Sequence, residues 1–374
     1  MTEECSNTIR PRQGRGATSA RDWPPPASCV LTPRRAAADD APMSDDVLAP
    51  NRLDRLHVNL GFSCNNNCWF CMEEDRERRE ENLRGQTDDD VRQMLIRHRA
   101  CGEVMFTSGE PTLHPKLPVY VAWAKKLGYP TIGLITNGRR LGYEPYAREL
   151  LSRGLNHVVV SLHGHTARLH ELLTRTPGSF AQTRDGVAML AKLRPEFPLK
   201  LHTSTVLNKR NAPHLGAVYH FLKDLGVEQV VFNTIQASGR GATHFKSLFP
   251  RYSELAREFG AFLAAEGREV TDAFLLDVPY CITEALPAIN RGFVERRVHY
   301  EPTAGASGEG DPLARYHTVD REDLNGMFKS KRPECGRCRH VTYCDGVFRA
   351  YTDAFGWDEL VPVPQGPPPV LSVP

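Results

Sequence analysis

The region from Leu53 to Ile235 constrains the fold most, because short apolar runs alternate there with longer amphipathic segments. The apolar runs have the length of strands, and the amphipathic segments have the length of helices. We expect strands at residues 53–60, 103–106, 131–136, 156–162, 199–206 and 229–235. We expect helices between them at residues 87–100, 117–127, 144–153, 179–193 and 212–225. Such an alternation is typical of a parallel sheet with right-handed crossovers, so the chain is predicted to be an α/β protein.

Six strand–helix repeats fit either an open doubly wound sheet or an incomplete barrel, and both collect ligands at the carboxyl ends of the strands. We expect a disordered tail at residues 1–50, where Pro, Arg, Ala, Ser and Asp predominate, and translation from Met1 or from Met43 fits this composition equally. The α/β core is predicted at 51–235. A small C-terminal module, rich in cysteine and including a strand at 273–278, is predicted at 236–360, and a Pro-rich tail at 361–374.

Composition limits the class of protein. The formal net charge of +2 over 374 residues gives no attraction to nucleic acid or to an anionic membrane. No apolar run approaches the ~20 residues that span a bilayer, and residues 1–42 contain no apolar segment typical of a signal peptide. We therefore expect a cytoplasmic protein with no nucleic-acid or membrane partner. Its ten cysteines then indicate metal binding or catalysis more than disulfides.

Three cysteines, Cys64, Cys68 and Cys71, directly follow the first predicted strand. Three thiolates within eight residues can hold one face of an iron–sulfur cluster, and Asn65, Asn66 and Asn67 between them can adopt unusual backbone angles. Because only three ligands are local, one iron would stay open for chemistry. A structural zinc site is the alternative, with Cys101 or His57 as the fourth ligand.

The pattern Cys-x-x-x-Cys-x-aromatic-Cys after the first strand of a six-fold β/α chain resembles the radical S-adenosylmethionine (SAM) superfamily. The resemblance covers about residues 53–235 and implies a partial (β/α)6 barrel, similar to a TIM barrel. It implies that a [4Fe-4S] cluster on Cys64, Cys68 and Cys71 binds S-adenosyl-L-methionine at its open iron. One electron, from a donor such as flavodoxin or ferredoxin, would cleave SAM to a 5′-deoxyadenosyl radical that abstracts a substrate hydrogen.

The same resemblance implies further cofactor-binding residues near the ends of the predicted strands. Residues 107–112, Thr-Ser-Gly-Glu-Pro-Thr, resemble the Gly-Gly-Glu-Pro segment that meets the methionine amino group in this family, with Ser108 in place of the first glycine. Gly109 permits close backbone approach, and a carboxylate suits an ammonium group. The cofactor-binding residues expected on this basis are Phe70, Gly109, Glu110, Asn137, Ser161 and Arg175.

A second group of cysteines lies near the C-terminus, at Cys335, Cys338 and Cys344, and Cys281 is the natural fourth ligand. Four soft ligands suit zinc or an iron–sulfur cluster, and spacing does not choose between them. The pattern resembles the twitch and SPASM extensions of radical SAM enzymes, which implies one auxiliary [4Fe-4S] cluster. If all four cysteines bind, no iron is open, so this cluster would transfer electrons. If Cys281 is not a ligand, the cluster could bind substrate directly.

The predicted function is therefore a radical SAM enzyme, an oxidoreductase that modifies its substrate by hydrogen abstraction. By analogy with twitch and SPASM relatives, the expected substrate is a peptide, and a small carbohydrate or alcohol is the second possibility. Two other classes stay open. One is a zinc-stabilised binding protein, and the other is an iron–sulfur electron carrier that does not cleave SAM.

Overall fold

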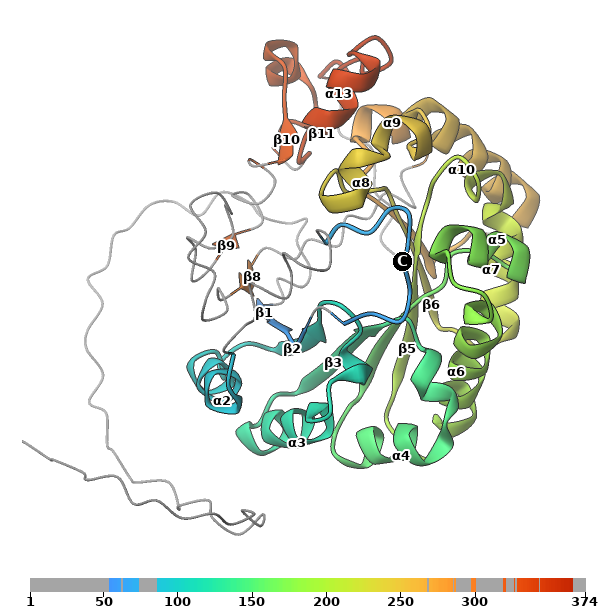
Figure 1. Ribbon diagram of the computed structural model, residues 1–374. Coiled ribbons are helices and arrows are strands. Elements are labelled where there is room, and N and C mark those ends of the chain that lie inside the picture. The colour runs from blue at the N-terminus through green and yellow to red at the C-terminus, as the bar shows by residue number, and fades with distance from the viewer. Residues whose placement is uncertain are drawn as a thin grey trace, which may run out of the picture. The chain divides into compact units, whose positions relative to one another are not determined.

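Seven parallel strands form the main sheet, and they lie in it in the order in which they occur along the chain (Figure 1). They are β1 (Asp54–Asn59), β2 (Glu103–Thr107), β3 (Thr131–Thr136), β4 (His157–Ser161), β5 (Lys200–Val206), β6 (Gln229–Asn233) and β7 (Ala273–Leu276). Because the order never reverses, each crossover advances the sheet in the same direction, as in a barrel, whereas a doubly wound sheet reverses at a switch point. The predicted α/β partial barrel is confirmed, and the doubly wound alternative is wrong.

This computed structural model describes residues 54–61, 63–73, 86–267, 269–284, 286, 297–300, 319–320, 326, 328–342 and 344–365. The predicted tail at 1–50, both candidate start residues, Cys5, Cys29 and residues 366–374 lie outside the described residues. Within the described part, no helix combines the length and the apolar character that crossing a membrane requires.

The sheet extends beyond the six predicted core strands at both edges. β7 coincides with the strand expected in the C-terminal module, yet it pairs with β6. At the other edge, β8 (Arg297–Tyr300) is parallel to β1, and β9 (Val319–Asp320) is antiparallel to β8. The strand order of the described residues ends at β7 and β9, so the sheet is open. The boundary expected at residue 235 thus falls inside one sheet, and a separate C-terminal module stays a prediction.

Helices follow the strands and cover the outer face of the sheet (Figure 1). They are α2 (Asp88–Arg97), α3 (Leu117–Leu127), α4 (Glu144–Ser152), α5 (Ala167–Thr174), α6 (Ser179–Leu193), α7 (Leu215–Asp224) and α10 (Tyr252–Glu266). Two short helices, α8 (Gly239–Thr243) and α9 (Phe245–Leu248), follow β6 at the carboxyl edge of the sheet. Thr87 begins α2 with a capping box shared with Asp90, which satisfies backbone N–H groups that have no partner within the helix.

The C-terminal residues form smaller elements. They are α11 (Tyr280–Thr283), the antiparallel pair β10 (Lys329–Ser330) and β11 (Val347–Phe348), the 3-10 helix η5 (Pro333–Arg337) and α13 (Arg349–Phe355). Three further 3-10 helices, η1 (Pro111–Leu113), η2 (Arg139–Gly142) and η3 (Ala212–His214), follow β2, β3 and β5.

The two faces of the sheet differ in chemistry. Residues that alternate toward the helices, such as Val58, Phe106 and Val160, are apolar and fully buried. The intervening positions face the inside of the barrel and are largely polar. The inner face therefore offers hydrogen-bonding groups along its length, and its carboxyl edge is the place where a ligand would enter.

A buried polar network closes the amino end of the inner face. Arg55 donates to Glu103 from Nε at 2.6 Å, Glu103 accepts from His157 Nδ1 at 2.7 Å, and the His157 and His202 rings meet at 3.1 Å between Nε2 and Nδ1. Burial, with the charge of His157, lowers the pKa of His202 to about 3. Burial, with the charge of Arg55, lowers the pKa of His57 to about 3 as well.

We expect the stability of the fold to fall as the pH drops below about 6.5. His57 and His202 stay neutral when folded but take up a proton when unfolded, so stability rises with pH between their folded and unfolded pKa values. Each histidine contributes a slope of at most about 1.4 kcal/mol per pH unit. Urea unfolding at pH 7 and pH 5.5 should show this loss, and His202→Gln should reduce it. An unchanged pH dependence in His202→Gln would contradict the assignment.

Candidate functional site

The loop that carries Cys64, Cys68 and Cys71 leaves β1 at the carboxyl edge of the sheet, and all three cysteines are partly buried. Burial raises the pKa of Cys64 to about 11, and the charges of Glu110, Cys71 and Glu73 act in the same direction. Burial also raises the pKa of Cys68 well above its usual range, with the charges of Cys71 and Cys64 adding to the effect. A positively charged metal group beside these thiols would favour their thiolate forms. These residues fit three corners of an iron–sulfur cluster.

Neighbouring elements hold this loop through its backbone. Four hydrogen bonds do so: Glu110 N to Ser63 O at 2.9 Å, Asn67 N to Thr174 O at 2.9 Å, Trp69 N to Leu173 O at 3.0 Å and Gly241 N to Cys71 O at 3.1 Å. The partners lie after β2, in α5 and in α8. Three segments far apart in the sequence therefore fix the spacing of the cysteines.

The asparagines of the loop contribute side chains and not unusual backbone angles. Among the described residues other than glycine, only Ser108, Arg175 and Asp277 have positive φ, so the expectation for Asn65, Asn66 and Asn67 was wrong. Their amides instead accept hydrogen bonds: Asn65 Oδ1 from Asn137 Nδ2 at 2.6 Å, Asn66 Oδ1 from Arg139 Nη1 at 3.0 Å, and Asn67 Oδ1 from Arg240 Nη1. These contacts tie the cysteine loop to the loop after β3 and to α8.

Ser108 and Gly109 turn the chain sharply after β2. Ser108 has φ 73° and Gly109 has φ 57°, both in the left-handed region that favours glycine. Ser108 replaces the first glycine of the family segment and therefore adopts a conformation that costs about 1 kcal/mol for a residue with a Cβ. The turn directs the Gly109 N–H toward Glu73, whose two carboxylate oxygens accept it at 3.0 Å.

Glu110 is buried and accepts four hydrogen bonds. Its Oε1 accepts from Thr112 N at 3.0 Å, from Thr112 Oγ1 at 2.6 Å and from Thr136 Oγ1 at 2.6 Å, and its Oε2 accepts from Asn137 N at 2.7 Å. Burial raises the pKa of this carboxyl group against the effect of these donors. Glu110 thus joins η1 to the end of β3. Its predicted contact with the methionine amino group stays a prediction, and Glu73 is a second carboxylate beside Cys64.

The other predicted cofactor-binding residues lie around the same edge. Asn137 is buried and contacts both Glu110 and the cysteine loop, while Ser161 ends β4 and is partly buried. Arg175 ends α5 and places its guanidinium 4.6 Å from the centre of the Trp69 ring. Phe70 is buried, with its ring edge-on to His163 at 4.7 Å between centroids. The structure brings these residues to one edge of the sheet, and their contacts with SAM remain predictions.

Sequence reasoning missed the contribution of α8. The charge of Arg240 acts to lower the pKa of Cys68, opposing the larger effect of burial. Gly239 has φ 52°, and a Cβ there would lie 2.4 Å from the Glu73 carbonyl oxygen. The segment Ser238-Gly-Arg-Gly after the sixth strand was a usable signal, since closely spaced glycines indicate a close backbone approach.

We expect Gly239→Ala to displace α8 from the cysteine loop and to lower the iron bound at Cys64, Cys68 and Cys71 by at least half. The matched control is Gly267→Ala, because Gly267 has φ 61° and no atom within 4 Å of the added Cβ. Both variants carry the same backbone strain, and only Gly239→Ala carries the clash. Iron analysis after anaerobic reconstitution measures the difference. Equal iron contents would show that this approach does not position the loop.

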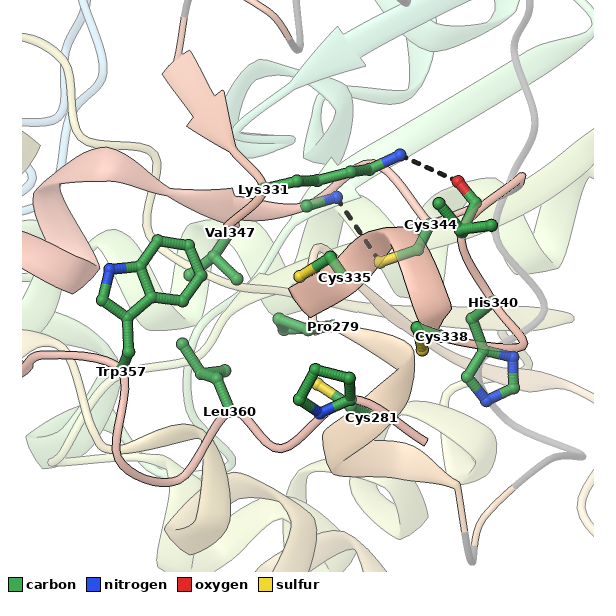
Figure 2. A pocket seen from close by; sticks show the side chains of 13 residues that line it. Pro279, Cys281, Lys331, Cys335, Cys338, His340, Cys344, Val347, Trp357 and Leu360 are labelled. Carbon is green, nitrogen blue, oxygen red and sulfur yellow. Dashed lines mark hydrogen bonds between the residues drawn. The ribbon is translucent and has the colours of Figure 1, made fainter. Parts of the chain in front are cut away.

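The second group of cysteines surrounds a cavity (Figure 2). Cys281 lies in α11, Cys335 in η5, Cys338 just after it and Cys344 before β11. Burial raises the pKa of Cys281 to about 12, and the charges of Cys344, Cys338 and Cys335 add to the effect. The four predicted ligands therefore converge although 63 positions separate the first from the last in the sequence. This set of four thiols fits a metal centre with no open position.

Among the described residues, no three His, Cys, Asp or Glu side chains are close enough, as they stand, to hold a single metal ion. Cys101, the alternative zinc ligand, is buried in the hydrophobic core, and none of the eight described cysteines forms a disulfide.

The family model described as the Radical SAM superfamily matches residues 58–222, a span that includes the first cysteine loop and strands β2 to β5. The chain contains a radical SAM domain. Among curated proteins, this domain is similar to the probable GTP 3′,8-cyclase of Saccharolobus solfataricus, with 28% identity over 194 residues, which are 52% of this chain and 61% of the relative. The protein of the same name from Metallosphaera sedula is 29% identical over 214 residues, 55% of this chain and 63% of the relative. The similarity thus spans less than two thirds of either relative.

Solved structures resemble the radical SAM domain together with part of the C-terminal region. Native anSMEcpe with bound AdoMet has a TM-score of 0.55 and 16% identity, and the match covers 80% of this chain and 90% of that one. Streptococcus suis SuiB bound to the precursor peptide SuiA has a TM-score of 0.56 and 13% identity, covering 81% and 73%. At these identities the likeness concerns the fold alone.

Proposed function

We propose that this protein is a radical SAM enzyme whose [4Fe-4S] cluster is held by Cys64, Cys68 and Cys71. The observation that carries the proposal is that one loop bears three partly buried thiols at the carboxyl edge of a radical SAM domain. The bound cluster would supply one electron to break the S–C5′ bond of SAM, giving methionine and a 5′-deoxyadenosyl radical that takes a hydrogen atom from the substrate. The electron would come from a donor such as flavodoxin or ferredoxin.

The chain's own residues would bind and orient SAM at this edge. Glu73 and Glu110 supply carboxylates near Cys64, and Arg175 beside Trp69 supplies a cation for the methionine carboxylate. Phe70 within the loop and Asn137 beside it are both buried, and they limit the access of water to the thiols. Ser161 adds a hydroxyl on the inner face. Exclusion of water from this edge would protect the radical from side reactions.

We further propose that Cys281, Cys335, Cys338 and Cys344 hold an auxiliary [4Fe-4S] cluster of the twitch type. Support comes from the convergence of the four thiols on one cavity and from two backbone donors to sulfur: Gly346 N to Cys344 Sγ at 3.4 Å and Val363 N to Cys338 Sγ at 3.3 Å. With four protein ligands this cluster would accept or pass on an electron. Such a role suits an oxidoreductase that oxidises its substrate overall.

A peptide is the substrate that we propose. Both structural neighbours also have solved structures that contain a peptide: anSMEcpe with the Cp18Cys peptide, and SuiB with the precursor peptide SuiA. The curated relatives are named for a nucleotide. A triphosphate needs several cations. The arginines at the carboxyl edge, Arg139, Arg175 and Arg240, instead contact side chains of the cysteine loop. A small carbohydrate or alcohol remains the second candidate substrate.

The deciding experiment is anaerobic. We expect about eight irons and no zinc per purified chain, because each cluster holds four irons. Addition of dithionite and SAM should yield 5′-deoxyadenosine, and GTP added as a probe should not increase the yield. Zinc without iron, and no 5′-deoxyadenosine after reconstitution, would indicate a zinc-stabilised binding protein. Iron without 5′-deoxyadenosine would indicate an electron carrier, and a GTP-dependent increase would favour a nucleotide substrate.

A further inference from the structure

Residues 357–364, which we name the C-terminal strap, run across the second cysteine cavity. Trp357, Leu360 and Pro362 line this cavity together with the four cysteines. Figure 2 shows Trp357 and Leu360 on one side of the cavity, with Cys335 and Cys281 between them and His340. Leu360 is 2% exposed. The strap thus gives the cavity an apolar wall.

One end of the strap is fastened to α10. The Glu359 carboxylate accepts from Tyr252 N at 3.0 Å, from Ser253 N at 3.3 Å and from Ser253 Oγ at 2.5 Å, and it also accepts from the Tyr351 hydroxyl. The N–H groups at the start of a helix have no partner within it, and the helix dipole favours a negative charge there. Glu359 therefore fixes the strap to a helix that packs beside the barrel.

The other end of the strap pairs with the cysteine segment. Arg339 N donates to Val363 O at 2.9 Å, Arg339 Nε donates to Pro364 O at 3.2 Å, and Cys338 forms an antiparallel bridge with Pro364. This pairing directs the Val363 N–H at Cys338 Sγ, 3.3 Å away. Pro362 and Pro364 have no backbone N–H, so Val363 supplies the one backbone donor of these three residues.

We infer that the strap is part of the second metal centre, with Glu359 and Val363 as positioning residues that set its reduction potential and shield it from solvent. The inference rests on the auxiliary cluster proposed above. An N–H aimed at a ligand sulfur stabilises negative charge on that sulfur, and reduction increases that charge, so the donor favours the reduced state. The apolar wall limits the access of water and oxygen to the cavity.

The test uses the full-length chain with Cys64, Cys68 and Cys71 replaced by alanine, so that any iron belongs to the second site. Val363→Pro removes the N–H, and Val363→Ala is the matched control because it keeps it. We expect both variants to retain iron and Val363→Pro to show a more negative midpoint potential in an anaerobic titration followed by electron paramagnetic resonance. Equal potentials in the two variants would overturn the inference.

A second variant covers the possibility that Val363→Pro retains no iron. Glu359→Ala changes no residue that lines the cavity, but it removes the carboxylate that attaches the strap to α10. We expect its visible iron–sulfur absorbance to bleach in air several-fold faster than that of the parent, and bleaching at the parent's rate would overturn the inference. If the parent with an intact strap holds no iron at all, the auxiliary cluster itself is refuted, which separates that failure from failure of the strap.

Discussion

We expect the variant with Cys64, Cys68 and Cys71 all replaced by alanine to lose at least about 1,000-fold of its formation of 5′-deoxyadenosine from SAM, since no cluster would remain at the SAM site to deliver the electron. The iron content should fall from about eight to about four per chain. Iron analysis and chromatography of the quenched reaction measure the two effects. The side chains removed are partly buried thiols at the edge of the core, so the fold should persist.

The matched control for this variant is Cys335→Ala with Cys338→Ala. It also removes thiols and about four irons, but from the second site, so SAM cleavage should continue while formation of the final product stops. The two variants should therefore give opposite results in the cleavage assay. Continued cleavage by the triple variant would refute the central assignment, and loss of cleavage in both would show that the second site supports the first.

The second large effect is expected at Glu110. In Glu110→Gln, the amide oxygen can replace the oxygen that accepts three hydrogen bonds, but the amide nitrogen then faces the Asn137 N–H, and two donors meet in a buried site. We expect a loss of about 3 kcal/mol in the free energy of unfolding, because an unsatisfied buried donor and a lost charged acceptor both contribute. Urea unfolding of the variant and the wild type gives the value.

Glu149→Gln is the control for Glu110→Gln, because Glu149 in α4 makes an exposed ion pair with Arg153, the residue that follows the helix. Its cost should be below about 1 kcal/mol. If Glu110→Gln is as stable as Glu149→Gln but loses SAM cleavage, then Glu110 acts on the cofactor and its role in joining η1 to β3 is minor. Loss of stability together with loss of iron would instead support the structural role.

The elements of the radical SAM domain could be predicted from the sequence because their signals are local. Six strands of the core follow from short apolar runs, and the strand observed as β7 follows from the same signal at residues 273–278. The capping box of α2 involves only the four consecutive residues from Thr87 to Asp90. The spacing of Cys64, Cys68 and Cys71 after a strand likewise indicates a cluster loop without reference to any distant residue.

Tertiary structure alone decided how these elements wind and what holds the site. The choice between a barrel and a doubly wound sheet depends on which strands pair. The apolar pattern within one strand does not identify its neighbours in the sheet. The four donors to Glu110, the approach of Gly239 to Glu73 and the link from Glu359 to α10 join residues that are distant in the sequence or oriented by the fold. Apolar patterning and cysteine spacing are properties of single segments. Contacts between segments depend on the path of the whole chain, so they became visible only when that path was known.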